Sequence, residues 1–137
     1  MTEEQIALAK RAVWCKGWRW MPGMLRGDGF RCTWVDEDER ELAAPTWCAN
    51  GIEWKNSRTG SKDLPDLTDP ATLGCLLALV REAWSDECVC VLPVDYGPGG
   101  VAWFCRLTVG GRDLARSYVP GSVGEAEALV AALEAAP

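Results

Sequence analysis

The sequence predicts an α+β fold, a mainly antiparallel sheet covered by three helices in an α/β sandwich, with a β-hairpin insertion around residues 27–63. Three observations lead to this class. Helix-start signals followed by apolar residues at helical spacing occur at three places in the chain. Runs of alternating apolar residues lie between them, and tight-turn residues join these runs, which favours antiparallel pairing. The length of 137 residues fits a single domain spanning 1–137.

The first helix is predicted over residues 3–16. Thr2 and Gln5 form a capping box, and Ile6, Ala9 and Val13 then define one apolar face. Gly17 follows directly and is typical of a left-handed helix stop.

Strand signals follow this helix. In WRWM, residues 18–21, alternation places Trp18 and Trp20 on one face and Arg19 on the other. The run FRCTW, residues 30–34, alternates in the same way, and the acidic DEDERE of residues 36–41 indicates a solvated turn. WCANGIEW, residues 47–54, centres on Asn-Gly and predicts a hairpin, and the polar residues 56–63 indicate a surface loop.

The second helix has the clearest signal in the chain. Asp69 is positioned to cap it and Pro70 occupies its first turn. Gly74 inside the helix costs about 1 kcal/mol relative to alanine, so we expect a close backbone neighbour there. The predicted apolar face consists of Leu73, Leu76, Leu77, Val80 and Trp84.

The C-terminal part predicts a strand meander and a helix. Residues 88–94 and 101–109 are expected to pair across the loop DYGPGG, and Gly110-Gly111 to turn the chain into a third strand. Trp103, Cys105, Leu107 and Val109 are expected on one face of the middle strand. Ser122 and Glu125 form a second capping box. The final helix carries the apolar residues Ala126, Leu129, Val130 and Leu133.

Composition excludes several classes of function. The net charge of −6 argues against general nucleic-acid binding. No apolar run reaches the about 18 residues of a membrane span, and the acidic N-terminal start is unlike an export signal, so we expect a soluble protein that stays in the cytoplasm. The seven cysteines are expected to remain thiols. Since the chain has no histidine and no C-x-x-C, the close pair Cys88 and Cys90 favours packing over zinc binding, and no metal or cofactor is predicted.

The same chemistry leaves the enzyme question open but leans against catalysis. Without histidine, a serine or cysteine nucleophile lacks its usual base. The sharper hypothesis concerns the basic N-terminal quarter, where indole rings and arginines occur together, a pairing that can stack rings and hold phosphates. The alternative is that the tryptophans belong to the core and the arginines to a solvated face. The predicted ligand-binding residues are Trp18, Arg19, Trp20, Arg26, Arg31 and Trp34.

Three segments carry a resemblance to a known family. ALAKRAVWCKGWRWMPGM, LPDLTDPATLGCLLALVREAW and GEAEALVAALEAA resemble small proteins of tailed phages and prophages, and their arrangement is similar to the phage ABA sandwich domain family. The resemblance implies an α/β sandwich and an accessory phage role, such as counter-defence, in the host bacterial cytoplasm. It supplies no catalytic residue.

Three hypotheses of function therefore stand beside one another. The first is a non-enzymatic accessory protein that binds a host factor through the basic-aromatic residues. The preferred candidate for this factor is a small anionic defence signal of the nucleotide type. The second is a protein-binding inhibitor or a structural phage protein that forms homo-oligomers. The third is a hydrolase of unfamiliar type.

Overall fold

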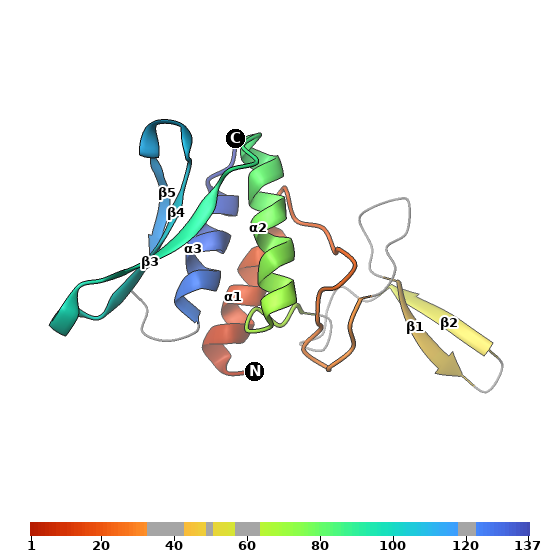
Figure 1. Ribbon diagram of the computed structural model, residues 1–137. Coiled ribbons are helices and arrows are strands. Elements are labelled where there is room, and N and C mark those ends of the chain that lie inside the picture. Colours follow the sequence, from red (N-terminus) through yellow and green to blue (C-terminus); the bar gives the residue numbers. More distant parts are fainter. Residues whose placement is uncertain (33–42, 49–50, 57–63, 118–122) are drawn as a thin grey trace.

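The computed structural model describes residues 1–32, 43–48, 51–56, 64–117 and 123–137 (Figure 1). Within them it shows an α+β fold, as predicted. The helices are α1 (Glu3–Trp14), α2 (Pro70–Trp84) and α3 (Val123–Glu134). An antiparallel sheet has the strand order β3 (Cys90–Asp95), β4 (Val101–Arg106) and β5 (Asp113–Ser117). A separate antiparallel hairpin consists of β1 (Ala43–Cys48) and β2 (Gly51–Asn56).

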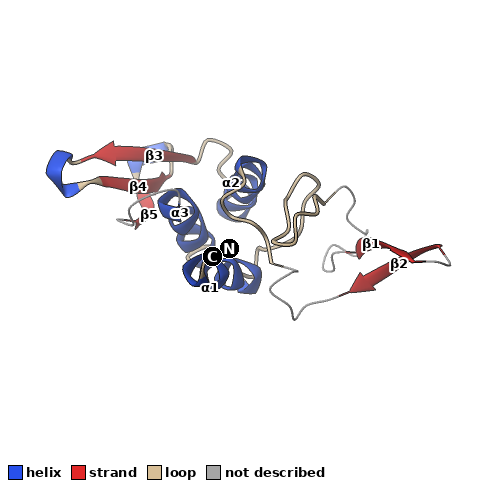
Figure 2. Ribbon diagram, turned by 90° about the horizontal axis from the view of Figure 1, so that it is seen from below, coloured by secondary structure: helices blue, strands red, loops and turns tan. Residues whose placement is uncertain are grey.

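The helices do not cover the sheet equally. α3 contacts all three strands of the sheet and also contacts α1 and α2, so it lies between the sheet and the other two helices (Figure 2). A helix in this position must be apolar on nearly all sides. α3 meets this requirement with alanines, which allow close approach, and with larger aliphatic residues; the buried members are Ala126, Ala128, Leu129, Val130, Ala132 and Leu133.

Several local signals are confirmed. The Thr2 hydroxyl accepts a hydrogen bond from Gln5 N, and the Gln5 side chain accepts one from Thr2 N. Asp69 caps α2, whose first residue is Pro70. The predicted hairpin is present as β1 and β2. Cys48 pairs with Gly51, so Gly51 belongs to β2 rather than to the turn, and residues 49 and 50 between the strands lie outside the described part. These signals succeed because each depends only on residues close in sequence.

Other local predictions are wrong. Residues 18–21 form no strand, and residues 30–32 contribute only an isolated bridge between Arg31 and Leu25. Gly17 is not left-handed: α1 ends at Trp14, and the extended Cys15 follows. Gly17 is instead a packing glycine, because a Cβ there would lie 3.2 Å from Leu133 Cδ1.

Gly74 has the opposite environment from the one predicted. It is exposed, and a Cβ added to it would meet nothing within 4 Å, so no close backbone neighbour explains this glycine. Its cost to the helix is uncompensated by packing.

The buried helix faces also differ in part from the predicted stripes. In α1, Ala9 is buried as expected, but Val13 is exposed, and Leu8 and Ala12 complete the buried stripe. In α2, Leu76 and Val80 are buried as predicted, whereas Leu73, Leu77 and Trp84 are half-buried. Thr72 and Leu79 complete the buried face of α2.

The sheet has the predicted meander. Trp103, Cys105 and Leu107 pack against the main core, as the alternation indicated. In β3, Pro93 lies opposite Trp103. Tyr96 N donates a hydrogen bond to Gly100 O at the end of this pair of strands. In an antiparallel pair every second residue bonds to the partner strand, so residues 94, 92 and 90 face β4 with their backbone groups. Pro93 lies between them, and its nitrogen therefore points away from β4.

The six described cysteines are free thiols: Cys15, Cys32, Cys75, Cys88, Cys90 and Cys105. Among the residues described, no group of three or more potential ligands is placed to hold a metal ion. None of the described helices is long and apolar enough to cross a bilayer.

Candidate functional site

Residues 15–32, which follow α1, contain five of the six predicted site residues, and this segment runs antiparallel along α2 (Figure 1). Near the C-terminal end of α2, the Arg19 guanidinium is bonded to both carboxylate oxygens of Glu82, at 3.0 and 2.6 Å. At the N-terminal end, Arg31 is bonded to Asp69. Arginines predicted as ligand-binding groups thus fasten a segment without regular secondary structure to a helix.

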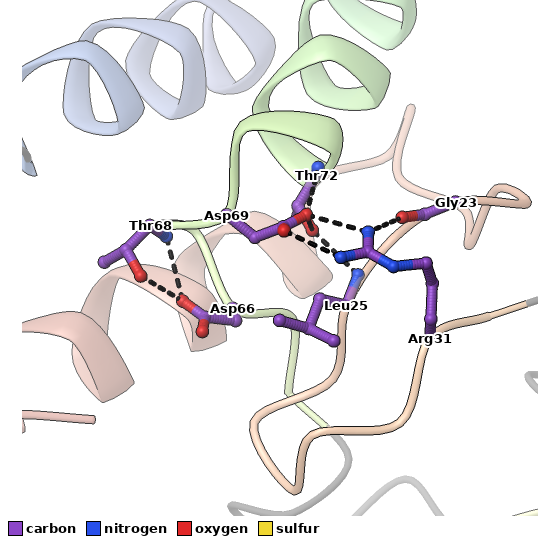
Figure 3. A network of polar contacts seen from close by, with 7 residues as sticks. All are labelled: Gly23, Leu25, Arg31, Asp66, Thr68, Asp69 and Thr72. Atoms are coloured by element: carbon purple, nitrogen blue, oxygen red, sulfur yellow. Dashed lines mark hydrogen bonds and ion pairs between the residues drawn. The ribbon is translucent and has the colours of Figure 1, made fainter.

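The contacts around Asp69 form a closed network, which we call the Asp69 network: Gly23, Leu25, Arg31, Asp69 and Thr72 (Figure 3). Asp69 accepts hydrogen bonds from Thr72 N and Thr72 Oγ1 at 2.8 and 3.0 Å. Arg31 approaches the two Asp69 oxygens at 3.1 and 3.0 Å and also donates to Gly23 O. Leu25 N donates to Thr72 Oγ1 at 2.8 Å. Chiefly because of the Arg31 bond, the pKa of Asp69 falls to about 2.

Arg26 occupies a different position in the same segment. It is almost fully buried, and its Nη2 lies 2.7 Å from Asp28 Oδ2. Arg26 is therefore paired within its own loop. Removing either partner of such a buried ion pair would leave an uncompensated charge.

The arginines are therefore not assembled into one patch. Arg19 and Arg31 are bonded to residues of α2 that lie 13 positions apart, and at 1.5 Å per residue this separation is about 20 Å. One small ligand cannot reach both guanidinium groups in this arrangement.

The predicted aromatic residues are mostly interior. Trp20 is buried, and Trp18 is half-buried and packs edge-on against it, with ring centroids 5.8 Å apart. Trp18 Nε1 is buried and has no hydrogen-bond partner in the described part of the chain. Trp34 lies outside the described residues. The ligand-binding role of these six residues stays a prediction.

A pocket does occur close by, at the C-terminal ends of the helices. Its volume is about 560 Å³. Trp14, the last residue of α1, forms part of its wall and is 86% exposed. We call this site the Trp14 pocket; it is lined by Lys10, Arg11, Trp14, Cys15, Lys16, Gly17, Ala83, Leu133, Glu134, Ala136 and Pro137.

The electrostatics of the Trp14 pocket are close to balanced. The last turns of α1, α2 and α3 all contribute to it, and each helix C-terminus carries about half a negative charge. Three cationic side chains and one anionic side chain line the same space, and the negative helix ends offset most of their net positive charge. A ligand therefore meets local ammonium groups rather than a broad positive field.

The three cations of the pocket differ in availability. Arg11 is bonded to Glu127 through Nη1 at 2.6 Å and to Glu134 through Nε and Nη2 at 2.9 and 2.8 Å. Lys10 and Lys16 are exposed, and neither has a carboxylate partner among the described residues. The two lysines are thus available to an incoming anion.

The only thiol among the lining residues is that of Cys15. Burial, reinforced by the charge of Glu134, raises the pKa of Cys15 to about 11. Near pH 7 this thiol is protonated and a poor nucleophile.

Sequence reasoning passed over Trp14 because it took the tryptophans at alternating spacing as the site. The helical pattern did contain the signal. At about 100° per residue, Trp14 lies about 160° around α1 from the middle of the buried stripe of Leu8, Ala9 and Ala12. An aromatic residue opposite the buried face of a surface helix is a candidate contact residue.

Comparison of the chain with family models, with curated proteins and with solved structures found no match. The resemblance to the phage ABA sandwich domain stays a prediction, and the function must be inferred from the geometry of the Trp14 pocket.

Proposed function

We propose that this protein is a non-enzymatic binding protein that holds a small anionic ligand with a planar ring, of the nucleotide type, in the Trp14 pocket. One observation carries the proposal: an 86% exposed indole stands at a pocket beside two lysines without carboxylate partners among the described residues. Indole faces stack on nucleobases, and ammonium groups pair with phosphates.

The dimensions and chemistry of the pocket support binding rather than turnover. A volume of about 560 Å³ lies within the usual range for small-molecule sites. The chain has no histidine, and the Cys15 thiol is protonated near neutral pH, so the common routes to covalent catalysis are missing there. In a phage accessory role, the ligand would be a host defence signal.

The expected affinity is modest. Stacking on one aromatic contributes about 1 to 3 kcal/mol, and exposed lysines contribute little more in salt, so we expect a dissociation constant of about 1 to 10 mM.

The test is calorimetric titration of the wild type and variants with mono-, di- and cyclic nucleotides, followed by chromatography of the recovered ligand. Trp14→Ala and Lys10→Ala/Lys16→Ala should each weaken binding at least about fivefold. Arg19→Ala/Arg31→Ala is the matched control, because both guanidinium groups lie outside the pocket lining, and it should retain binding within about threefold.

Three outcomes would contradict the proposal. Absence of binding across the panel would favour a protein partner instead, for which Trp14 and the neighbouring exposed Val13 form the apolar contact. Loss of binding only in the arginine variant would return the site to the residues around Arg19 and Arg31. A chemically altered ligand would identify an enzyme.

A further inference from the structure

We propose that Arg11 receives the anionic group of the ligand, and that Glu134 occupies its place until the ligand arrives. This inference rests on the proposed function of the Trp14 pocket. It specifies the ligand group as a phosphate or carboxylate that offers two oxygens to one arginine.

The bonding of Arg11 is divided between its two sides. Nε and Nη2 hold both oxygens of Glu134 at 2.9 and 2.8 Å, the side-by-side arrangement in which arginine binds carboxylates and phosphates. Nη1 holds Glu127 at 2.6 Å. Arg11 and Glu134 line the Trp14 pocket, whereas Glu127 is not among its lining residues. The part of the guanidinium that already binds a two-oxygen anion is therefore paired with a pocket residue.

Glu134 is easily displaced. It is the last residue of α3, where the negative end of the helix disfavours a carboxylate, and its side chain is 39% exposed. The hydrogen bonds from Arg11 hold the pKa of Glu134 below its ordinary value, because they favour the ionised carboxylate. An exposed ion pair of this kind is weak, so the Glu134 carboxylate can move into solvent when another anion binds Nε and Nη2 of Arg11.

Glu127 then completes the arrangement. It remains bonded to Nη1 during the exchange and fixes the orientation of the guanidinium on α1. A ligand that carries two oxygens close together gains the bonds that Glu134 gives up, and its ring remains within reach of Trp14 across the same pocket.

The test is calorimetric titration of wild type, Glu134→Gln and Glu127→Gln with AMP and with adenosine. Both variants remove one carboxylate from Arg11 and change the net charge equally, so they are matched. Glu134→Gln should tighten AMP binding about three- to tenfold, because the competing carboxylate is gone, and Glu127→Gln should change it less than about twofold. Adenosine has no anionic group, so its binding should be the same in all three proteins. Thermal unfolding verifies that each variant is folded.

A further variant separates charge from geometry. Arg11→Lys keeps the positive charge but loses the fork, and it should weaken AMP binding about fivefold without affecting adenosine. Equal tightening in both glutamine variants, or no change in either, would overturn the exchange while the dependence of AMP binding on Trp14 keeps the proposed function intact. If AMP binds Glu134→Gln but not the wild type, Glu134 blocks Arg11 and is not displaced, so both the exchange and the proposed function fail. If AMP binds none of the proteins, both fail.

The same titration can compare the two anionic groups that this arrangement would accept, a phosphate and a carboxylate. Replacing AMP with the adenosine 5′-carboxylate analogue tests whether a carboxylate suffices. The same response to Glu134→Gln is expected for both, since each presents two oxygens to the fork.

Discussion

The Asp69 network lies at the N-terminal end of helix α2. In it, Arg31 and Asp69 are bonded to each other and to backbone groups. At its C-terminal end, α2 borders the Trp14 pocket, where Lys10 and Lys16 have no such partners among the described residues. Both regions combine cations with neighbouring aromatic or apolar residues. The difference shows that binding capacity depends on whether each cation has a partner and on how exposed that partner is, not on how many cations a segment contains.

The largest difference between the two ends should appear in stability. Asp69→Ala removes the cap of α2 and the partners of Arg31 and Thr72, and it should lower the free energy of unfolding by about 2 to 3 kcal/mol. Glu82→Ala removes an acid whose side chain is 61% exposed, and it should cost less than about 0.5 kcal/mol. Urea denaturation measures both, and equal losses would show that the network is no more than a surface ion pair.

A second contrast concerns two glycines near the two ends. Gly74→Ala should raise the free energy of unfolding by about 0.5 to 1 kcal/mol, because the methyl group meets open space and alanine favours the helix. Gly17→Ala should give no such gain, since its Cβ would lie 3.2 Å from Leu133 Cδ1. A comparable stabilisation by both substitutions in denaturant titration would mean that the wall of the Trp14 pocket is loosely packed.

Acid should loosen the Asp69 network. The pKa of Asp69 in the folded protein, about 2, lies below its ordinary value of 3.8, so the ionised form is favoured by folding. Its contribution is complete above about pH 4 and is lost as the pH falls toward 2. Unfolding measured across this range should therefore depend less on pH in Asp69→Asn than in the wild type, and an unchanged dependence would contradict the assignment.

The smallest effect is expected at the Trp14 pocket. Trp14→Ala should leave the free energy of unfolding within about 0.5 kcal/mol of the wild type, because the indole has little burial to lose. A loss above 1 kcal/mol in the same assay would assign Trp14 to the core rather than to a binding surface.

The sequence predicted well what is encoded locally. The caps at Thr2 and Asp69 and the hairpin around residues 49–50 depend on neighbours a few positions apart, and they are confirmed. The partners of the arginines could not be found in this way. Glu82 follows Arg19 by 63 positions and Asp69 follows Arg31 by 38, so only the packing of the loop on α2 reveals that these guanidinium groups are already bonded.

The strand predicted for residues 18–21 failed for a related reason. Alternation of Trp18 and Trp20 is typical of a strand, but no neighbouring strand pairs with this segment, which lies along a helix instead. Tertiary packing overrides such a short pattern.

Pro93 bears on how the protein behaves at high concentration. β3 is an outer strand of its sheet, and Leu92 and Val94 are exposed beside Pro93, a combination that invites edge-to-edge association between molecules. Proline has no N–H, so β3 lacks an outward-facing hydrogen-bond donor at Pro93. A strand from a second molecule therefore cannot form a continuous ladder of hydrogen bonds along β3. The chain thus carries an apolar ribbon at its surface together with a built-in barrier to fibril growth along it.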